Sequence, residues 1–179
     1  MRRVRRAILL LALPLAGCAA PDPKAELEVR GLEAYWAVDT PRGGEQYIAP
    51  AVRFEVSNRG QRPWGSIQAS AGFRRPNDQG VLEEWGGDWK QVAPSRKPLA
   101  PGESTLVVLK SDARYHSPGP PESMFQHGQF RDAKVEVYLR LGSSGWVKFG
   151  EAPVERRIGA RSVPEDVREA PAPARSPAQ

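Results

Sequence analysis

The sequence predicts an all-β protein built as a single antiparallel β-sandwich of seven to eight strands. Three observations lead to this expectation. Between residues 27 and 158 the chain contains short runs in which apolar and polar residues alternate, with the two-residue period of a half-buried strand. Clusters rich in Pro, Gly, Asn and Asp separate these runs. No stretch after residue 18 has a sustained helical period, and short strands joined by turns are typical of sandwiches.

The first 17 residues have the layout of a secretory signal peptide. Arginines at positions 2, 3, 5 and 6 precede an apolar stretch over residues 7–16. This stretch is too short to cross a bilayer as a helix, which takes about 20 residues. It closes on Leu15-Ala16-Gly17-Cys18, and these four residues resemble the lipobox of bacterial lipoproteins. The resemblance implies cleavage before Cys18 and attachment of fatty acyl chains such as palmitate to the Cys18 sulfur.

The residue that follows Cys18 indicates in which membrane the lipid anchor is expected to lie. Ala19 stands where an aspartate would, in that family, imply retention in the inner membrane. In a host with two membranes, the resemblance therefore implies a lipid anchor in the outer membrane, on its periplasmic side. The alternatives are an uncleaved anchor, which Pro14 disfavours by interrupting the apolar run, and a twin-arginine export signal built on Arg5-Arg6.

Removal of the signal peptide changes the charge of the protein. The full chain has 26 Lys and Arg residues against 21 Asp and Glu residues, a net charge of +5. Four of those arginines belong to residues 1–17, which leaves 22 basic and 21 acidic residues and a net charge of +1. Such a balance lacks the basic excess that nucleic-acid binding needs, so we expect no nucleic-acid partner. With the single cysteine lipidated, no thiol remains for a disulfide or a metal site.

The strands predicted in the first half differ in clarity. The first run switches the parity of its apolar residues between Val29 and Leu32, which indicates a bulge or a bend. The clearest run places Val52, Phe54 and Val56 on one face and turns at Asn58-Arg59-Gly60. The expected strands of this half begin at residue 27 and cover residues 51–58, 66–74 and 81–85.

The second half begins with a rigid corner at residues 98–103, Pro-Leu-Ala-Pro-Gly-Glu, and continues as a strand over 104–109. An irregular excursion over residues 112–130 follows. A clean alternation at residues 134–141 then predicts a strand, and Gly142-Ser143-Ser144-Gly145 predicts a hairpin into a strand at 146–149. A last alternating run extends from residue 153 to residue 158.

Two polar segments flank the predicted domain of residues 27–158. Residues 18–26 are expected to form a lipidated tether. Residues 159–179 are rich in Ala and Pro and lack aromatic side chains, so we expect a disordered tail. The alternative for this tail is that it docks on a partner as an extended proline-rich ligand.

Two short motifs resemble the immunoglobulin-like domains of bacterial envelope proteins. In those families a strand ends in Asn-x-Gly, as at Asn58-Arg59-Gly60, and a Pro-Gly-Glu corner, as at Pro101-Gly102-Glu103, introduces the strand that crosses the sandwich. The resemblance implies an immunoglobulin-like sandwich for residues 27–158. It carries no catalytic residue over to this chain.

Trp85-Gly86-Gly87-Asp88-Trp89 is the predicted ligand-binding segment. On an unbroken strand, Trp85 and Trp89 share one face, and the two glycines leave the surface between them open. Exposed indoles stack on sugar rings, and Asp88 is placed to bind hydroxyl groups. The alternative is that the tryptophans fill the core, because they are large and apolar.

The excursion of residues 112–130 is the predicted partner-binding segment, with Tyr115 and Phe125 as its contact residues. A long connection in a compact domain is usually functional or mobile. The alternative, which its apolar residues Met124, Phe125 and Phe130 favour, is that it packs down and caps one end of the sandwich.

Catalytic and metal sites have weaker sequence support. His116 and His127 are the only histidines, and with Asp112 and Glu122 nearby they lack the short fixed spacings of metal motifs, so we expect neither a metal nor a cofactor. A hydrolase would need Asp88, Asp112 or His116 to converge in one cleft. The glycines around Ser143-Ser144 are explained by a turn, and the adjacent Glu83 and Glu84 point to opposite faces of a strand.

We therefore expect a non-enzymatic, lipid-anchored protein of the cell envelope that acts as a binding or assembly accessory for another envelope protein. Its expected contact surfaces are an edge strand and the excursion around Phe125. The alternative function is binding of a carbohydrate or of peptidoglycan by an exposed pair, Trp85 and Trp89.

Overall fold

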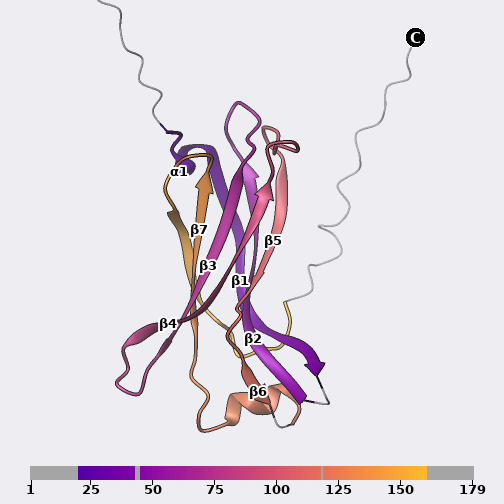
Figure 1. The fold of residues 1–179 in the computed structure, drawn as a ribbon, viewed down its shortest axis with the longest axis vertical. Helices are drawn as coiled ribbons and strands as arrows, with labels where there is room; N and C mark the ends of the chain where they lie inside the picture. Colours follow the sequence, from indigo (N-terminus) through magenta and orange to yellow (C-terminus); the bar gives the residue numbers. More distant parts are fainter. Residues whose placement is uncertain (1–19, 43–44, 118, 161–179) are drawn as a thin grey trace, which may run out of the picture.

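The structure, a computed structural model, describes residues 20–42, 45–117 and 119–160, and it confirms the antiparallel β-sandwich. Two four-stranded sheets face each other (Figure 1). The first sheet has the order β1-β2-β5, and β6 pairs with the beginning of β2; the second has the order β4-β3-β7-β8. In the second sheet β3 and β7 are the central strands, and β4 and β8 lie at its two edges. The strands are β1 (Leu27–Arg42), β2 (Glu45–Asn58), β3 (Ile67–Pro76), β4 (Leu82–Ala93), β5 (Ser104–Lys110), β6 (Tyr115–Ser117), β7 (Lys134–Leu141) and β8 (Val147–Pro153).

The bulge expected in the first strand is confirmed. The register between β1 and β2 shifts between Arg30 and Glu33. Gly31 lies in this interval with a φ of 59°, a conformation that costs other residues energy. The bulge moves the apolar residues after it onto the other parity, so that Leu27 and Trp36 both reach the core.

Three strand segments were not expected from the sequence. β2 begins at Glu45 rather than at residue 51, β4 continues through Gly86-Gly87 to Ala93, and β6 lies within the excursion. The glycine pair weakens the strand signal of β4, and β6 is too short for its alternation to be recognised. β4 bonds to β3 and β6 bonds to β2, and the local sequence of a strand does not show which strand will be its partner.

The core lies between the sheets and follows the predicted alternation. Every second residue of β3 and β7 is buried over most of its length. The largest side chains that are almost wholly buried come from both sheets and include Trp36, Phe54, Phe73, Ile48, Ile67, Leu109, Leu139 and Leu141. Strands of both sheets therefore share one core.

The two motifs of the immunoglobulin-like resemblance contact each other in space. The Asn58 N–H donates to the Glu103 C=O at 2.9 Å, and the Gly102 N–H donates to the Asn58 C=O at 2.7 Å. The Asn58 side chain is fully buried and donates from Nδ2 to the carbonyls of Arg62 at 2.8 Å and Leu99 at 2.9 Å. Asn58 thus joins the end of β2 to the corner that introduces β5.

The chain on either side of the predicted domain is in part held against it. A short helix α1 (Pro23–Glu26), capped by the Asp22 side chain, lies within the expected tether at one end of the sandwich (Figure 1). Its Glu26 carboxylate accepts from the Trp64 indole N–H at 2.8 Å. At the other boundary, the Gly159 N–H donates to the Trp36 C=O at 2.9 Å. Glu26 and Gly159, just outside the expected bounds of 27–158, therefore both bond to the sandwich.

The signal peptide, the lipidation residue Cys18 and residues 161–179 of the predicted tail lie outside the described residues. Within the described part of the chain, no helix is both long and apolar enough to cross a membrane.

Candidate functional site

The tryptophan pair of the predicted ligand site is split by a bulge in β4. The register between β3 and β4 shifts between Phe73 and Arg74, and Trp85 is the extra residue opposite this step. The Trp85 indole packs against Trp36 and Tyr115, with ring centroids 6.0 and 4.8 Å apart. Trp85 is therefore half-buried within the aromatic packing of the domain.

Trp89 lies on the opposite face of the same strand. It pairs with Ser70, whose neighbours Ala69 and Ala71 face the core, so the Trp89 indole points outward and is 61% exposed. The prediction that Trp85 and Trp89 share one face is wrong, because the bulge changes the parity of β4 between them. The two indoles form no common surface for a sugar.

Asp88 acts between the two sheets rather than as a ligand for hydroxyl groups. Its Oδ2 accepts from the Lys110 N–H at 3.0 Å and its Oδ1 from the Trp89 N–H at 2.8 Å. The Asp112 Oδ1 accepts from the Gly87 N–H at 3.1 Å. The two carboxylates therefore bond backbone N–H groups of β4 and β5, and the predicted sugar-binding role of Asp88 is not supported.

Gly86 lies in close contact with the segment after β5, so it does not leave an open surface between the two tryptophans. A Cβ built on Gly86 would lie 2.6 Å from Asp112 Oδ1 and 2.8 Å from Ala113 Cβ, and closer still to Ser111 Oγ. The segment after β5 therefore passes directly over this glycine.

Substitution of Gly86 by alanine is expected to destabilise the protein by about 1–3 kcal/mol, because the segment after β5 must move away. The matched control is Gly72→Ala, since a Cβ on Gly72 has no neighbour within 4 Å. Urea unfolding of both variants checks this expectation. Equal stabilities of the two variants would contradict the close approach.

Tyr115 and Phe125, the predicted partner-binding residues, belong to an aromatic cluster around Trp36. The ring centroids of Tyr115, Phe125 and Phe130 lie 5.7, 6.3 and 5.1 Å from that of Trp36. The Tyr115 hydroxyl also accepts from the Arg75 guanidinium at 3.0 Å. The excursion, with β6 and the 3₁₀ helix η1 (Pro121–Gln126), caps this end of the sandwich (Figure 1), so the capping alternative is confirmed.

His116, Ser144 and Glu83, which were weighed for catalysis or metal binding, take part in three separate contacts. The His116 ring packs against Tyr47 in a tilted arrangement, with centroids 5.2 Å apart, and Ser144 Oγ accepts from the Leu141 N–H in the β7–β8 hairpin. Glu83 accepts from the Asn77 amide at 2.6 Å. Within the described residues, no three or more His, Cys, Asp or Glu side chains are grouped so that they could hold a metal ion.

A groove of about 470 Å³ lies on the outer face of the second sheet. We call it the outer groove; it is lined by Ser70, Gly72, Arg74, Glu84, Glu136, Tyr138 and Trp146. None of these residues was singled out as a binding residue from the sequence. The outward parity of residues 134–141 is the signal that identifies Glu136 and Tyr138, but only the sheet order brings them beside β3 and β4.

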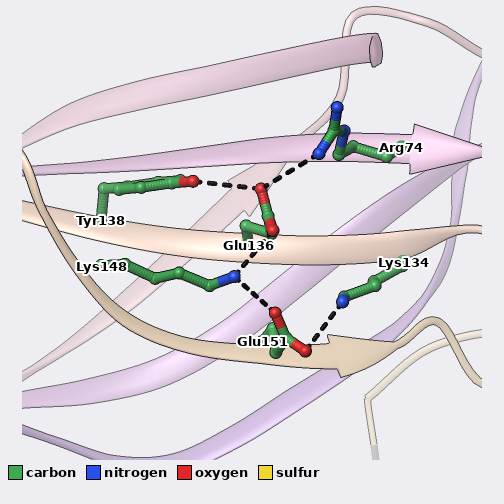
Figure 2. A network of polar contacts seen from close by, with 6 residues as sticks. All are labelled: Arg74, Lys134, Glu136, Tyr138, Lys148 and Glu151. Atoms are coloured by element: carbon green, nitrogen blue, oxygen red, sulfur yellow. Dashed lines mark hydrogen bonds and ion pairs between the residues drawn. The ribbon is translucent and has the colours of Figure 1, made fainter. Parts of the chain in front are cut away.

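A chain of polar contacts crosses this outer face (Figure 2). Glu136 accepts from Lys148 at 2.7 Å and from the Tyr138 hydroxyl at 3.0 Å, and Glu151 accepts from Lys134 at 2.7 Å and from Lys148. The bond from Lys148 lowers the pKa of Glu136, and the bonds from Lys134 and Lys148 lower the pKa of Glu151 to about 2.

The Glu151 carboxyl is expected to titrate near pH 2 rather than near its ordinary value of 4.5. Because the folded-state pKa is lowered, the stabilising contribution is present above pH 4.5 and is lost as the pH falls through about 2. Carboxyl NMR shifts followed against pH check this value. In Lys148→Met the midpoint is expected to rise, and an unchanged midpoint would contradict the assigned cause.

The edge of β5 that faces away from β2 is a second feature of the surface. The Ser111 N–H donates to the Pro50 C=O, so odd-numbered residues of this ladder bond toward β2 and even-numbered ones point away. At this outer edge the Lys110 N–H and the Val108 C=O are bonded by side chains of β4, from Asp88 and Lys90. The backbone of Leu106 points to the same edge by the same alternation.

The other edge of the first sheet is covered by the chain after β8. The Trp36 N–H donates to the Arg157 C=O at 3.0 Å, and the Glu155 N–H donates to the Ala34 C=O at 3.1 Å. This segment runs along β1 and blocks it against further pairing.

Comparison with solved structures finds a number of similar chains, of which two are described here. A protein named ApaA from Bordetella pertussis is 15% identical, with a TM-score of 0.36 over 72% of this chain and 92% of that chain. The structural genomics target SoR45 is 9% identical, with a TM-score of 0.34 over 75% and 86% of the two chains. No protein-family model and no curated protein matches the sequence.

Proposed function

We propose that this protein is a non-enzymatic lipoprotein of the cell envelope that binds another envelope protein through the outer edge of β5. The lipid anchor at Cys18 holds the domain at the outer membrane, on the periplasmic side in a host with two membranes. The bound segment of the partner adds as a strand beside β5, and the protein acts as an accessory to the assembly or positioning of that partner.

The observation that carries this proposal is the exposure of apolar side chains on β5. Leu106 is 64% exposed and Val108 is 36% exposed, and both lie on the outward face of the strand. Of the large hydrophobic residues found exposed in the described part of the chain, Leu106 has the greatest exposed fraction. An apolar strand at a sheet edge is a template for pairing with a second chain.

A groove of about 270 Å³ beside this strand supports the same surface. Residues 90–92 of β4 form one wall, and residues 105–108 of β5 form the other. A strand paired with β5 directs alternate side chains toward such a groove, which supplies specificity in addition to backbone hydrogen bonds. The side chain of Lys90 lies across one end and limits unspecific pairing.

The lipid anchor is supported by residues 15–18 and by the polar residues that follow. Its test is metabolic labelling of the full chain with a fatty-acid analogue. We expect label in the wild-type protein and none in Cys18→Ala. An unlabelled, freely soluble wild-type product would contradict the anchor.

The partner-binding surface is tested by photo-crosslinking in intact cells, with a benzophenone amino acid at position 106 and a control at position 89. We expect one defined protein adduct from position 106 and none from position 89.

The adduct is expected to be lost when proline replaces Val108 in the same chain. The N–H of Val108 points away from β2, so proline removes a donor of the outer edge and leaves the β2–β5 ladder intact. Circular dichroism verifies that the variant is folded. An equal adduct in the folded proline variant, or the same adduct from position 89, would contradict edge pairing.

A further inference from the structure

We infer that the outer groove binds an uncharged saccharide, a ligand distinct from the protein partner proposed for β5. Three properties of the groove lead to this assignment: a floor of small residues, aromatic side chains at its wall, and a local balance of charge. The volume of about 470 Å³ is that of a small-molecule site.

The floor of the groove is formed by small residues at the centre of the second sheet. Ser70 and Gly72 lie on the outward face of β3, and Gly72 pairs with Gly87 on one side and with Glu136 on the other. A Cβ on Gly72 would meet no heavy atom within 4 Å, so the space above this glycine is open. A flat ligand can therefore approach the backbone of the sheet.

Aromatic side chains stand beside this floor. Tyr138 pairs with Ser70 across β3 and β7, and Trp89 pairs with Ser70 from β4, so a phenol and an indole flank the same serine. Trp146 lines the groove with 42% of its surface exposed, and the Arg140 guanidinium lies over its ring at 5.0 Å. The Trp146 indole is therefore exposed at the wall of the groove, beside polar side chains. Its ring can stack on the apolar face of a sugar while the polar side chains bond the hydroxyl groups.

The groove is lined by one cation, Arg74, and two carboxylates, Glu84 and Glu136, and the neighbouring Lys148, bonded to Glu136, brings the local charge into balance. Arg74 and Glu84 are neighbours across β3 and β4, and Glu136 is paired with Lys148 and lies 3.9 Å from Arg74. An anionic ligand would meet two carboxylates, and a cationic ligand would meet Arg74 and Lys148. A ligand with hydroxyl groups and no net charge can instead accept from the guanidinium and donate to Glu84.

A protein ligand fits the outer groove less well than it fits β5. The groove lies over the centre of a sheet whose backbone groups are already paired, so it offers no edge for a further strand. Its lining is small and polar along the floor, whereas a protein interface is usually centred on large apolar anchors.

The test is isothermal titration calorimetry of the full chain, purified in a zwitterionic detergent, with cellotetraose and chitotetraose as neutral probes and tetragalacturonate as the anionic probe. We expect saturable binding of at least one neutral probe and none of the anionic one. Trp146→Ala is expected to weaken that binding by about tenfold, the effect of losing one aromatic contact.

Gly72→Val is expected to abolish binding by filling the floor, and the open space above this residue lets the variant fold. Leu106→Ala is the matched control, since it alters β5 and leaves the groove unchanged. Thermal unfolding verifies that each variant is folded. Absence of saturable binding to both neutral probes, unchanged affinity in folded Gly72→Val, or preference for tetragalacturonate would each overturn the inference, and none of these results bears on the β5 edge.

Discussion

Replacement of Asn58 by leucine is expected to lower the free energy of unfolding by roughly 3–5 kcal/mol, because each buried partner left without its hydrogen bond costs about 1–3 kcal/mol. The Asn58 side chain bonds the carbonyls of Arg62 and Leu99 and accepts from the Gly60 N–H at 2.9 Å. Leucine has a similar size but offers none of these bonds. Urea unfolding followed by circular dichroism measures the loss.

Two further substitutions sharpen this prediction. Asn58→Asp keeps the acceptor for Gly60 but turns a carboxylate oxygen toward two carbonyls, so it is expected to be destabilising at neutral pH and less so in acid, where the carboxyl can donate. The control is Gln126→Leu, at an exposed position. If Asn58→Leu were as stable as this control, Asn58 would not be the link between β2 and the corner.

Replacement of Trp36 by alanine is expected to cost about 3–5 kcal/mol, the range for removing a buried aromatic side chain. Trp36 is fully buried, and four aromatic rings have centroids within 6.3 Å of its own. Its loss leaves a cavity where the excursion packs on the sandwich. We expect the cap to open together with the core, so that hydrogen exchange of η1 amides increases as the protein is destabilised.

Two variants separate packing from polarity in this cluster. The indole N–H of Trp36 is buried and has no hydrogen-bond acceptor within the described residues, so Trp36→Phe removes an unpaired donor along with part of the volume. It is therefore expected to cost less than half as much as Trp36→Ala. Trp89→Ala, at an exposed indole, is expected to have almost no effect on stability. A large loss in Trp89→Ala, or equal losses in both Trp36 variants, would contradict this interpretation.

The two motifs at Asn58 and Gly102 show what a local sequence motif can predict and what it cannot. Asn58-Arg59-Gly60 and Pro101-Gly102-Glu103 were recognised separately, and the sequence contains no sign that one bonds the other. The contact follows from the sheet order, which places the end of β2 beside the start of β5. The motifs thus agreed with the sandwich that the strand pattern predicted, and the contact between them accounts for the burial of Asn58.

The segment from Trp85 to Trp89 shows where local reasoning fails. The alternation rule places residues four apart on one face only while the strand is regular. A single extra residue opposite Phe73 and Arg74 places Trp85 and Trp89 on opposite faces. The sequence of the segment gives no sign of this extra residue. The same limit applies to Gly86, whose role depends on a segment about 25 residues further along the chain.

What the sequence determined by itself is the pattern of strands: alternation and turn residues act over a few neighbours, and they sufficed for the sandwich, the bulge after Val29 and the hairpin at residues 142–145. Only the tertiary structure decided which surfaces are open. The outer groove joins residues of β3, β4 and β7 with Trp146, and the outer edge of β5 depends on which strands remain unpaired. Both are products of sheet order, because the pairing of distant strands is set by the packing of the whole domain and not by any one segment.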